Sequence, residues 1–151
     1  MKKLFECKAR YNAINESDGK EIVKSETYLV DAVSFTEAEA ITVKYLEEVV
    51  TGSFTVTAIK RSSVEDIVNA SDEGKYYLAK VRFISIDEAT GKGKQATIQL
   101  LVQADTPEQT LDAVKEHTKE WMIDISVVGI AESKIVDTVP NVEPEEVDEE
   151  E

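Results

Sequence analysis

Two short basic motifs are the residues of this chain whose types and spacing could do chemistry. Lys8 and Arg10 are separated by one residue, and Lys80 and Arg82 repeat that spacing about 72 residues later. Side chains two apart in a β-strand lie on one face of the sheet, so each motif would place two cations side by side. Cations interleaved with aromatic rings on a sheet suit the phosphates and bases of single-stranded nucleic acid. The motifs therefore predict a nucleic-acid-binding face.

This predicted face extends beyond the two motifs. Tyr76 alternates with Lys80 and Arg82 along one stretch of chain and is predicted to stack on a base. A nearby Gly-rich loop adds two more lysines. The full set of predicted nucleic-acid-binding residues is Lys8, Arg10, Tyr76, Lys80, Arg82, Lys92 and Lys94.

Two other interpretations of the same face remain open. In the first, the Lys and Arg side chains only keep an exposed sheet soluble, and cross-strand carboxylates such as Glu6, Glu26 or Asp31 neutralise them. In the second, the face binds a protein, and the chain is an assembly or regulatory subunit with no nucleic-acid role. Whether the bases gather on one face or pair with carboxylates discriminates between these hypotheses.

No catalytic or cofactor-binding signature accompanies the motifs. His117 is the single histidine, lies among charged residues at helical spacing, and is predicted to face solvent without a metal partner. The loop from Asp87 to Gly91 lacks the spaced oxygen ligands of a calcium loop. The segment from Gly91 to Lys94 has no Ser or Thr after its lysine, which a phosphate-cradling loop requires. We therefore expect a non-enzymatic protein with no metal and no cofactor.

The end of the chain is strongly acidic. Residues 143–151 carry seven acids and no base, so about half of the net charge of −14 lies there and about −7 remains for the rest. Such a segment cannot bury enough apolar surface to offset its ordering entropy, so a disordered tail is predicted. The tail is interpreted as a solubilising segment, as a mimic of nucleic acid that competes for the basic face, or as the binding site of a protein partner.

The elements that must position the motifs occur twice. Three blocks recur in order at a nearly constant offset, which indicates an internal duplication. The paired blocks are residues 7–11 and 79–83, 30–34 and 102–106, and 54–59 and 125–130.

Each copy predicts two strands, a capped helix and a further strand. Period-two alternation and β-branched residues predict strands over 4–11, 26–33 and 53–60 in the first copy. In the second copy they predict strands over 76–86 and 95–104, and one or two strands within 123–136. Ser34 with Glu37, and Thr106 with Gln109, have the spacing of a capping box at a helix start. Cys7 falls on an inward strand position and is predicted to be a small buried hydrophobe.

Together these patterns predict an α+β fold built from a duplicated β-β-α-β unit. The two copies are expected to pack as one domain, in a sheet with both helices on one face. The expected boundaries are 1–61 for the first repeat, 62–75 for a linker with a short helix, 76–138 for the second repeat and 139–151 for the disordered acidic tail. Two loosely coupled small domains are the alternative.

Composition limits the remaining choices. The chain has 151 residues, 42% of them hydrophobic and 32% charged, with one cysteine. No apolar run approaches the roughly 18 residues of a membrane helix, and no secretion signal is recognised at the N-terminus. A lone cysteine fits a reducing compartment. We expect a cytoplasmic protein with no membrane role, and the pattern leaves its oligomeric state open.

Two segments carry a resemblance to a known family. The runs over residues 3–11 and 28–40 resemble a small family of uncharacterised proteins from Bacteroidetes and their phages, over about residues 2–135. The resemblance implies a cytoplasmic protein encoded on phage or mobile-element DNA. It carries no functional residues, and it favours a replication or recombination role only by association.

Overall fold

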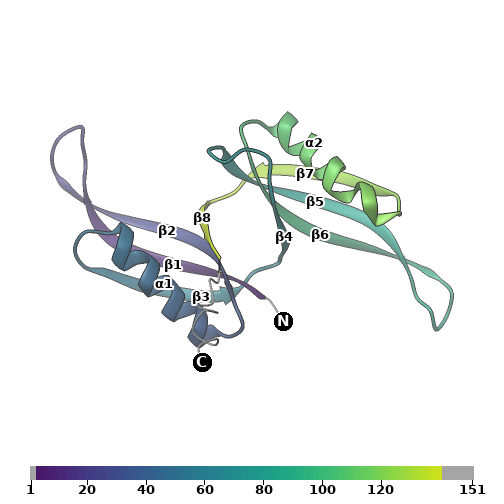
Figure 1. Ribbon diagram of the computed structural model, residues 1–151, viewed down its shortest axis with the longest axis horizontal. Helices are drawn as coiled ribbons and strands as arrows, with labels where there is room; N and C mark the ends of the chain where they lie inside the picture. Colours follow the sequence, from purple (N-terminus) through teal and green to yellow (C-terminus); the bar gives the residue numbers. More distant parts are fainter. Residues whose placement is uncertain (1–2, 141–151) are drawn as a thin grey trace, which may run out of the picture. The chain divides into compact units, whose positions relative to one another are not determined.

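The computed structural model describes residues 3–140 and shows eight strands, two α-helices and one short 3-10 helix, which confirms the α+β class (Figure 1). In chain order the elements are β1 (Lys3–Ile14), β2 (Glu21–Ala32), α1 (Phe35–Val49), β3 (Phe54–Arg61), β4 (Val64–Asn69), β5 (Lys75–Ile86), β6 (Gly93–Ala104), α2 (Pro107–Thr118), η1 (Lys119–Trp121), β7 (Ile125–Glu132) and β8 (Ile135–Val139).

These elements form two compact units. Among the described residues, unit 1 contains 3–62 and 137–140, and unit 2 is Ser63–Val136. Each unit has its own four-stranded sheet, in the order β3-β1-β2-β8 in unit 1 and β4-β6-β5-β7 in unit 2. The expected single sheet shared by both copies is therefore wrong. Each sheet buries its own helix over its own core, so no shared core is needed.

In each sheet, one strand follows directly, in the sequence, a strand of the other unit's sheet. β4 follows β3 in the sequence but pairs in parallel with β6 of unit 2. β8 follows β7 but lies beside β2 of unit 1. The short helix predicted within 62–75 is thus wrong, because pairing with residues of β6 fixes Val64–Asn69 as a strand. The predicted tail also begins too early, since Val139 ends β8.

The two units repeat the same local construction. In unit 1 the long hairpin pairs Lys3 with Ala32, and in unit 2 the corresponding pair is Lys75 with Ala104. The third strand pairs with the central strand in both, and each pairing has a register shift at the same step of the central strand. Strand positions that correspond in the two units can therefore be compared directly.

The predicted helix caps are confirmed in both units. The Ser34 hydroxyl accepts from the Glu37 backbone N–H at 3.1 Å, and the Thr106 hydroxyl accepts from the Gln109 N–H at 3.1 Å. The side chains of Glu37 and Gln109 accept in turn from backbone N–H groups just before the helix. Because these bonds satisfy donors that the first helical turn leaves free, they fix where each helix begins.

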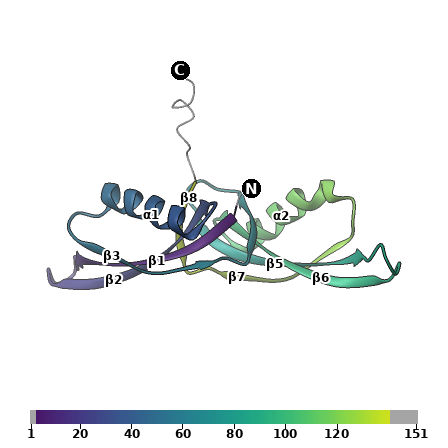
Figure 2. The ribbon, with the colours of Figure 1, turned by 90° about the horizontal axis from the view of Figure 1, so that it is seen from below.

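The helix of each unit covers one face of its sheet and leaves the other face without a helix (Figure 2). Phe5 and Leu46 are buried in the core of unit 1, and Val81 and Val114 are buried in the core of unit 2. Burying such a side chain contributes roughly 1.5–3 kcal/mol, so this packing decides which strand face turns inward. The alternate residues of the central strands β1 and β5 must then lie on the face away from the helix, here called the outer face.

Candidate nucleic-acid interface

Lys8 and Arg10 lie on the outer face of unit 1, as predicted. Their neighbours along β1 on either side, Cys7 and Ala9, are fully buried against the helix, and both bases are exposed. Small and hydroxyl-bearing residues flank them on the adjacent strands. The cross-strand neighbours are Thr27 and Ala58 beside Lys8, and Ser25 and Thr55 beside Arg10.

Unit 2 presents the same arrangement. Lys80 and Arg82 are exposed on the outer face of β5, with the buried Val81 between them. Their cross-strand neighbours are Gln99 and Gly129 beside Lys80, and Thr97 and Ser126 beside Arg82. In both units the arginine therefore lies between two hydroxyl side chains.

Carboxylates do not pair with these four bases. Among residues 3–140, no ion pair within 4.0 Å involves Lys8, Arg10, Lys80 or Arg82, whereas Lys60 pairs with Glu6 at 3.8 Å. The predicted neutralising carboxylates are committed elsewhere or lie on the other face. Glu26 is on the helix-side face, where it accepts from the hydroxyls of two tyrosines, and Asp31 is aligned with Leu4 rather than with a base.

Three members of the predicted set do not join this surface. Tyr76 is only 8% exposed, so its ring is not presented to a base, and the predicted stacking role is wrong. Alternation assigned its face but gave no information on what covers that face. Lys94 belongs to β6 and pairs with Ser85, which puts it on the face opposite Lys80 and Arg82. Lys92 is exposed in the hairpin loop.

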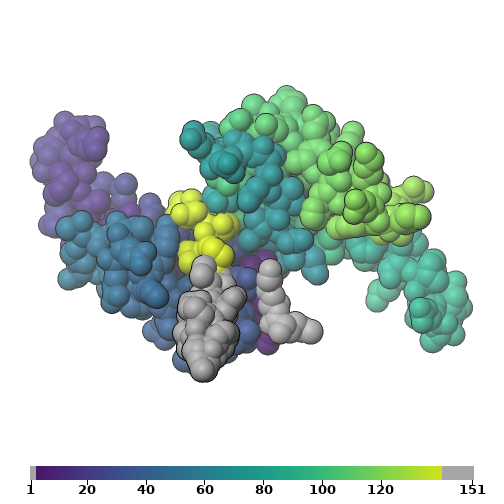
Figure 3. All heavy atoms as spheres, viewed as in Figure 1, coloured from purple at the N-terminus to yellow at the C-terminus, as the bar shows by residue number. Residues whose placement is uncertain are grey.

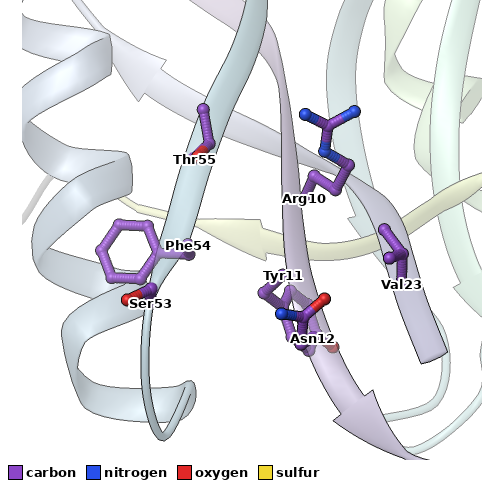
Figure 4. Close-up of a pocket in the computed structure, with 7 residues that line it drawn as sticks. All are labelled: Arg10, Tyr11, Asn12, Val23, Ser53, Phe54 and Thr55. Atoms are coloured by element: carbon purple, nitrogen blue, oxygen red, sulfur yellow. The ribbon is translucent and has the colours of Figure 1, made fainter. Parts of the chain in front are cut away.

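Beside Arg10, the sheet of unit 1 is hollowed where β3 begins, and side chains from both faces of the sheet line the hollow (Figure 4). β3 begins at Phe54, opposite Tyr11, and β1 continues past that point without a neighbour on this side. The resulting hollow encloses about 330 Å³. It is lined by Arg10, Tyr11, Asn12, Val23, Ser53, Phe54 and Thr55. Sequence analysis missed it, and the available signal was the turn at Gly52, which marks where β3 must start.

The corresponding end of unit 2 is also hollowed but has a different lining. It encloses about 510 Å³ and is lined by Ile84, Ile86, Met122, Ile123 and Asp124. The side chain of Met122 is 89% exposed, and its backbone has a φ of 60°, in the left-handed region that non-glycine residues rarely adopt. In Figure 3 the loop end of each long hairpin, purple in unit 1 and teal in unit 2, projects from its own unit.

A ring on each helix contacts the added fourth strand of its sheet. In unit 1 the Tyr45 hydroxyl donates to Asp137 of β8 at 2.7 Å. In unit 2 the His117 Nε2 lies 3.6 Å from an Asp66 oxygen of β4. His117 is 29% exposed and packs edge-on against Trp121, so the prediction that it simply faces solvent is wrong. These contacts serve the attachment of β4 and β8.

Several acidic protons of unit 1 are held tightly. Burial raises the pKa of the Cys7 thiol above its ordinary value, and the thiol is fully buried as predicted. Burial, and then the Glu26 carboxylate that its hydroxyl contacts at 2.7 Å, raise the pKa of Tyr28. Burial and the same carboxylate also raise the pKa of Tyr11. These groups are neutral hydrogen-bond donors or core atoms at neutral pH.

The part of the chain that the structure describes has neither a metal-ligand cluster nor a membrane-spanning helix. Within residues 3–140, no cluster of three or more His, Cys, Asp or Glu side chains is arranged to hold a metal ion. None of the helices there has both the length and the apolar character needed to cross a membrane.

Comparison with known proteins gives a family without an assigned activity. Residues 3–141 match the family described as Domain of unknown function (DUF4494), and because the match spans nearly all of both units, the chain belongs to that family. No curated protein sequence and no solved structure matches the chain.

Proposed function

We propose that this member of the family is a non-enzymatic binding module for single-stranded nucleic acid. The phosphates contact Lys8, Arg10, Lys80 and Arg82 on the outer faces of the two sheets. The observation that supports this most strongly is that these four bases are exposed, share one face in each unit, and have no ion-pair partner among residues 3–140. In a chain with a net charge of −14, two pairs of cations at matched positions of the two units run against the prevailing negative charge.

The geometry of each pair suits an extended phosphate backbone. Residues two apart on a strand lie about 6.6–6.8 Å apart, so Lys8 and Arg10 can each contact a different phosphate. A guanidinium donates two parallel hydrogen bonds to one phosphate, and the flanking hydroxyls of Ser25 and Thr55 can donate to its other oxygens. Without Tyr76 as a stacking ring, most of the affinity is electrostatic, and binding is strongly salt-dependent.

The acidic tail is proposed to compete with nucleic acid for these bases or to recruit a protein partner. Residues 143–151 lie outside the described residues, and the proposal rests on their seven acids. At physiological salt, charges interact over about 8 Å, so a tail must reach the bases to compete. Deletion of residues 143–151 is expected to tighten binding, and an unchanged affinity would leave the tail only a solubilising role.

The wider setting is proposed on weaker grounds. The matched elements, registers and caps of the two units support descent from a duplicated β-β-α-β unit. A role in replication or recombination of a phage or mobile element, in the cytoplasm, rests on the sequence resemblance alone.

A second candidate function is a protein-interaction, assembly or regulatory subunit with no nucleic-acid role. The observation that favours it is the cluster of exposed large apolar side chains at one end of unit 2. These are Ile84, Ile86, Met122 and Ile123, which are 45–89% exposed. Exposed apolar clusters of this kind mark protein contacts more often than nucleic-acid contacts.

Binding to a labelled 30-mer of single-stranded DNA, followed by fluorescence anisotropy, tests the proposal. Reversing the charge of both bases in unit 2, by Lys80→Glu with Arg82→Glu, is expected to weaken binding about 100-fold, because two contacts become two repulsions. The matched control reverses two exposed helix lysines, Lys44→Glu with Lys115→Glu, and should have a much smaller effect. Equal losses in the two variants, or no binding by the unaltered protein at low salt, would refute the proposal.

A further inference from the structure

We propose that the hollow beside Arg10 in unit 1 seats one nucleotide of the bound strand and that unit 2 has no equivalent seat. This inference rests on the proposed function and deepens it, because it assigns a nucleotide-binding site to one unit only. The hollow of about 330 Å³ is at the lower end of the roughly 300–1,000 Å³ typical of ligand sites, which suits a ligand as small as a nucleotide.

The charge of the lining favours an anionic ligand. Arg10 is the only charged side chain among the residues that line the hollow. The Ser53 and Thr55 hydroxyls lie on the β3 side of the hollow and can donate to phosphate oxygens that the guanidinium holds. Glu26 follows Ser25, the residue that pairs with Arg10 across the hairpin. Its carboxylate is not part of the lining and already accepts hydrogen bonds from two hydroxyls.

Other groups of the lining suit a base. Asn12 and Val23 face each other across the hairpin, two pairing steps beyond Arg10 (Figure 4). The Asn12 amide supplies both donors and an acceptor, as the hydrogen-bonding edge of a base requires. Val23 is 64% exposed, which gives the flat face of a base an apolar surface to cover.

The rings that complete the lining are held in place by contacts within unit 1. The Tyr11 hydroxyl donates to Glu26 at 3.0 Å, so this hydroxyl is engaged before a ligand arrives. Phe54 packs against the core of unit 1. A lining fixed in this way loses little conformational entropy when a ligand binds.

Unit 2 replaces the features that would hold a nucleotide. Its hairpin pairs Ile84 with Gln95 at the step where unit 1 pairs Asn12 with Val23. The lining of its hollow contains Asp124 and no Lys or Arg side chain. The remaining side chains are Ile84, Ile86, Met122 and Ile123. A carboxylate there repels a phosphate, and the apolar side chains offer no partner for the edge of a base.

Titration of the full-length protein with thymidine 5′-monophosphate, followed by amide chemical shifts, tests the inference. Thymidine and inorganic phosphate are titrated separately to resolve the contributions of base and phosphate. The nucleotide is expected to shift the amides of Asn12, Val23 and Ser53–Thr55. Arg10→Ala should weaken binding of the nucleotide at least about tenfold, whereas the matched Arg82→Ala should weaken it far less. Lys44→Ala, on an exposed face of the helix, should leave it unchanged. Asn12→Ala should weaken binding of the nucleotide but not binding of inorganic phosphate. Ile84→Ala should weaken neither.

The outcomes separate this inference from the proposed function. Equal losses from Arg10→Ala and Arg82→Ala, or shifts scattered outside the hollow, would overturn the nucleotide seat. If the 30-mer still binds in that case, the proposed function stands without it. A protein that binds the mononucleotide in the hollow but not the 30-mer would retain the seat and refute the strand-binding function.

Discussion

Unit 1 and unit 2 share one backbone plan but differ on the helix-side face of their sheets. In unit 1, Glu26 accepts from the hydroxyls of Tyr11 and Tyr28 at 3.0 and 2.7 Å. The positions that correspond by strand pairing in unit 2 are Ile98, Phe83 and Leu100, which are all apolar. The helix-side chemistry therefore changes from a hydrogen-bonded cluster to hydrocarbon, while the outer-face bases are the same. A feature kept across such a change is best explained by a demand on the outer surface itself, since core packing does not require it.

A second difference concerns the turn that leads from the helix into the third strand. Unit 1 makes this turn with Gly52 at a φ of 105°, which costs a glycine nothing. Unit 2 places Met122 at a φ of 60°, and an L-residue there costs roughly 1–2 kcal/mol. The same turn therefore presents an exposed apolar side chain in unit 2 and none in unit 1.

Among single substitutions, removing the acceptor at the centre of the hydrogen-bonded cluster should cause the largest loss of stability. Glu26→Ala leaves the Tyr28 hydroxyl without its acceptor on a side chain that is 3% exposed, so unit 1 should lose about 2 kcal/mol of unfolding free energy. Urea unfolding followed by the reactivity of Cys7, the only cysteine, reports on unit 1. The fluorescence of Trp121, the only tryptophan, reports on unit 2 and should not change.

A triple variant completes this test. Adding Tyr11→Phe and Tyr28→Phe to Glu26→Ala removes both hydroxyls and makes unit 1 resemble unit 2, so much of the loss should be recovered. If the triple variant is less stable than Glu26→Ala, the hydroxyls do not depend on this carboxylate.

High pH should weaken unit 1 through its raised pKa values. Above about pH 9 to 10 the unfolded chain releases the protons of Cys7 and Tyr28, while folded unit 1 keeps them. The unfolded state then binds fewer protons, so stability falls with rising pH, by about 1.4 kcal/mol per pH unit for each group. Urea titrations between pH 8 and pH 11 measure this slope. Tyr28→Phe should make the slope shallower, and an unaltered slope would remove Tyr28 from the explanation.

Met122→Gly should have the smallest effect and the opposite sign. Glycine adopts a positive φ without strain, and the side chain that is lost is 89% exposed, so unit 2 should gain up to about 1 kcal/mol. Trp121 fluorescence in urea measures the change. The matched substitution Gly52→Ala should weaken unit 1 by a similar amount, and a loss of stability in Met122→Gly would contradict the strain.

Local features of this fold were predictable from the sequence, and long-range ones were not. The caps at Ser34 and Thr106 and the alternation around Lys8 and Lys80 depend on neighbouring residues, and these predictions were confirmed. The placement of Val64–Asn69 depends on pairing with a strand about 35 residues further along the chain, which the local sequence does not show, and the predicted short helix was wrong.

The candidate site shows the same division. Alternation correctly put Lys8, Arg10, Lys80 and Arg82 on the outer face, because burial of their neighbours decides that face. It could not show that Tyr76 is covered, since cover comes from residues distant in the sequence. Nor could it show the hollow beside Arg10. The hollow exists because β1 continues beyond Tyr11, the residue opposite the first residue of β3.

The salt dependence of binding to the 30-mer tests the central claim most directly. Each contact between a Lys or Arg side chain and a phosphate of a single strand contributes about −0.7 to the slope of log K against log salt concentration. Four such contacts predict a slope of about −2.8. Lys80→Ala with Arg82→Ala should reduce it to about −1.4, and the same change at Lys8 and Arg10 should match it. A slope that neither pair alters would show that these bases do not contact the strand, and the account would be wrong.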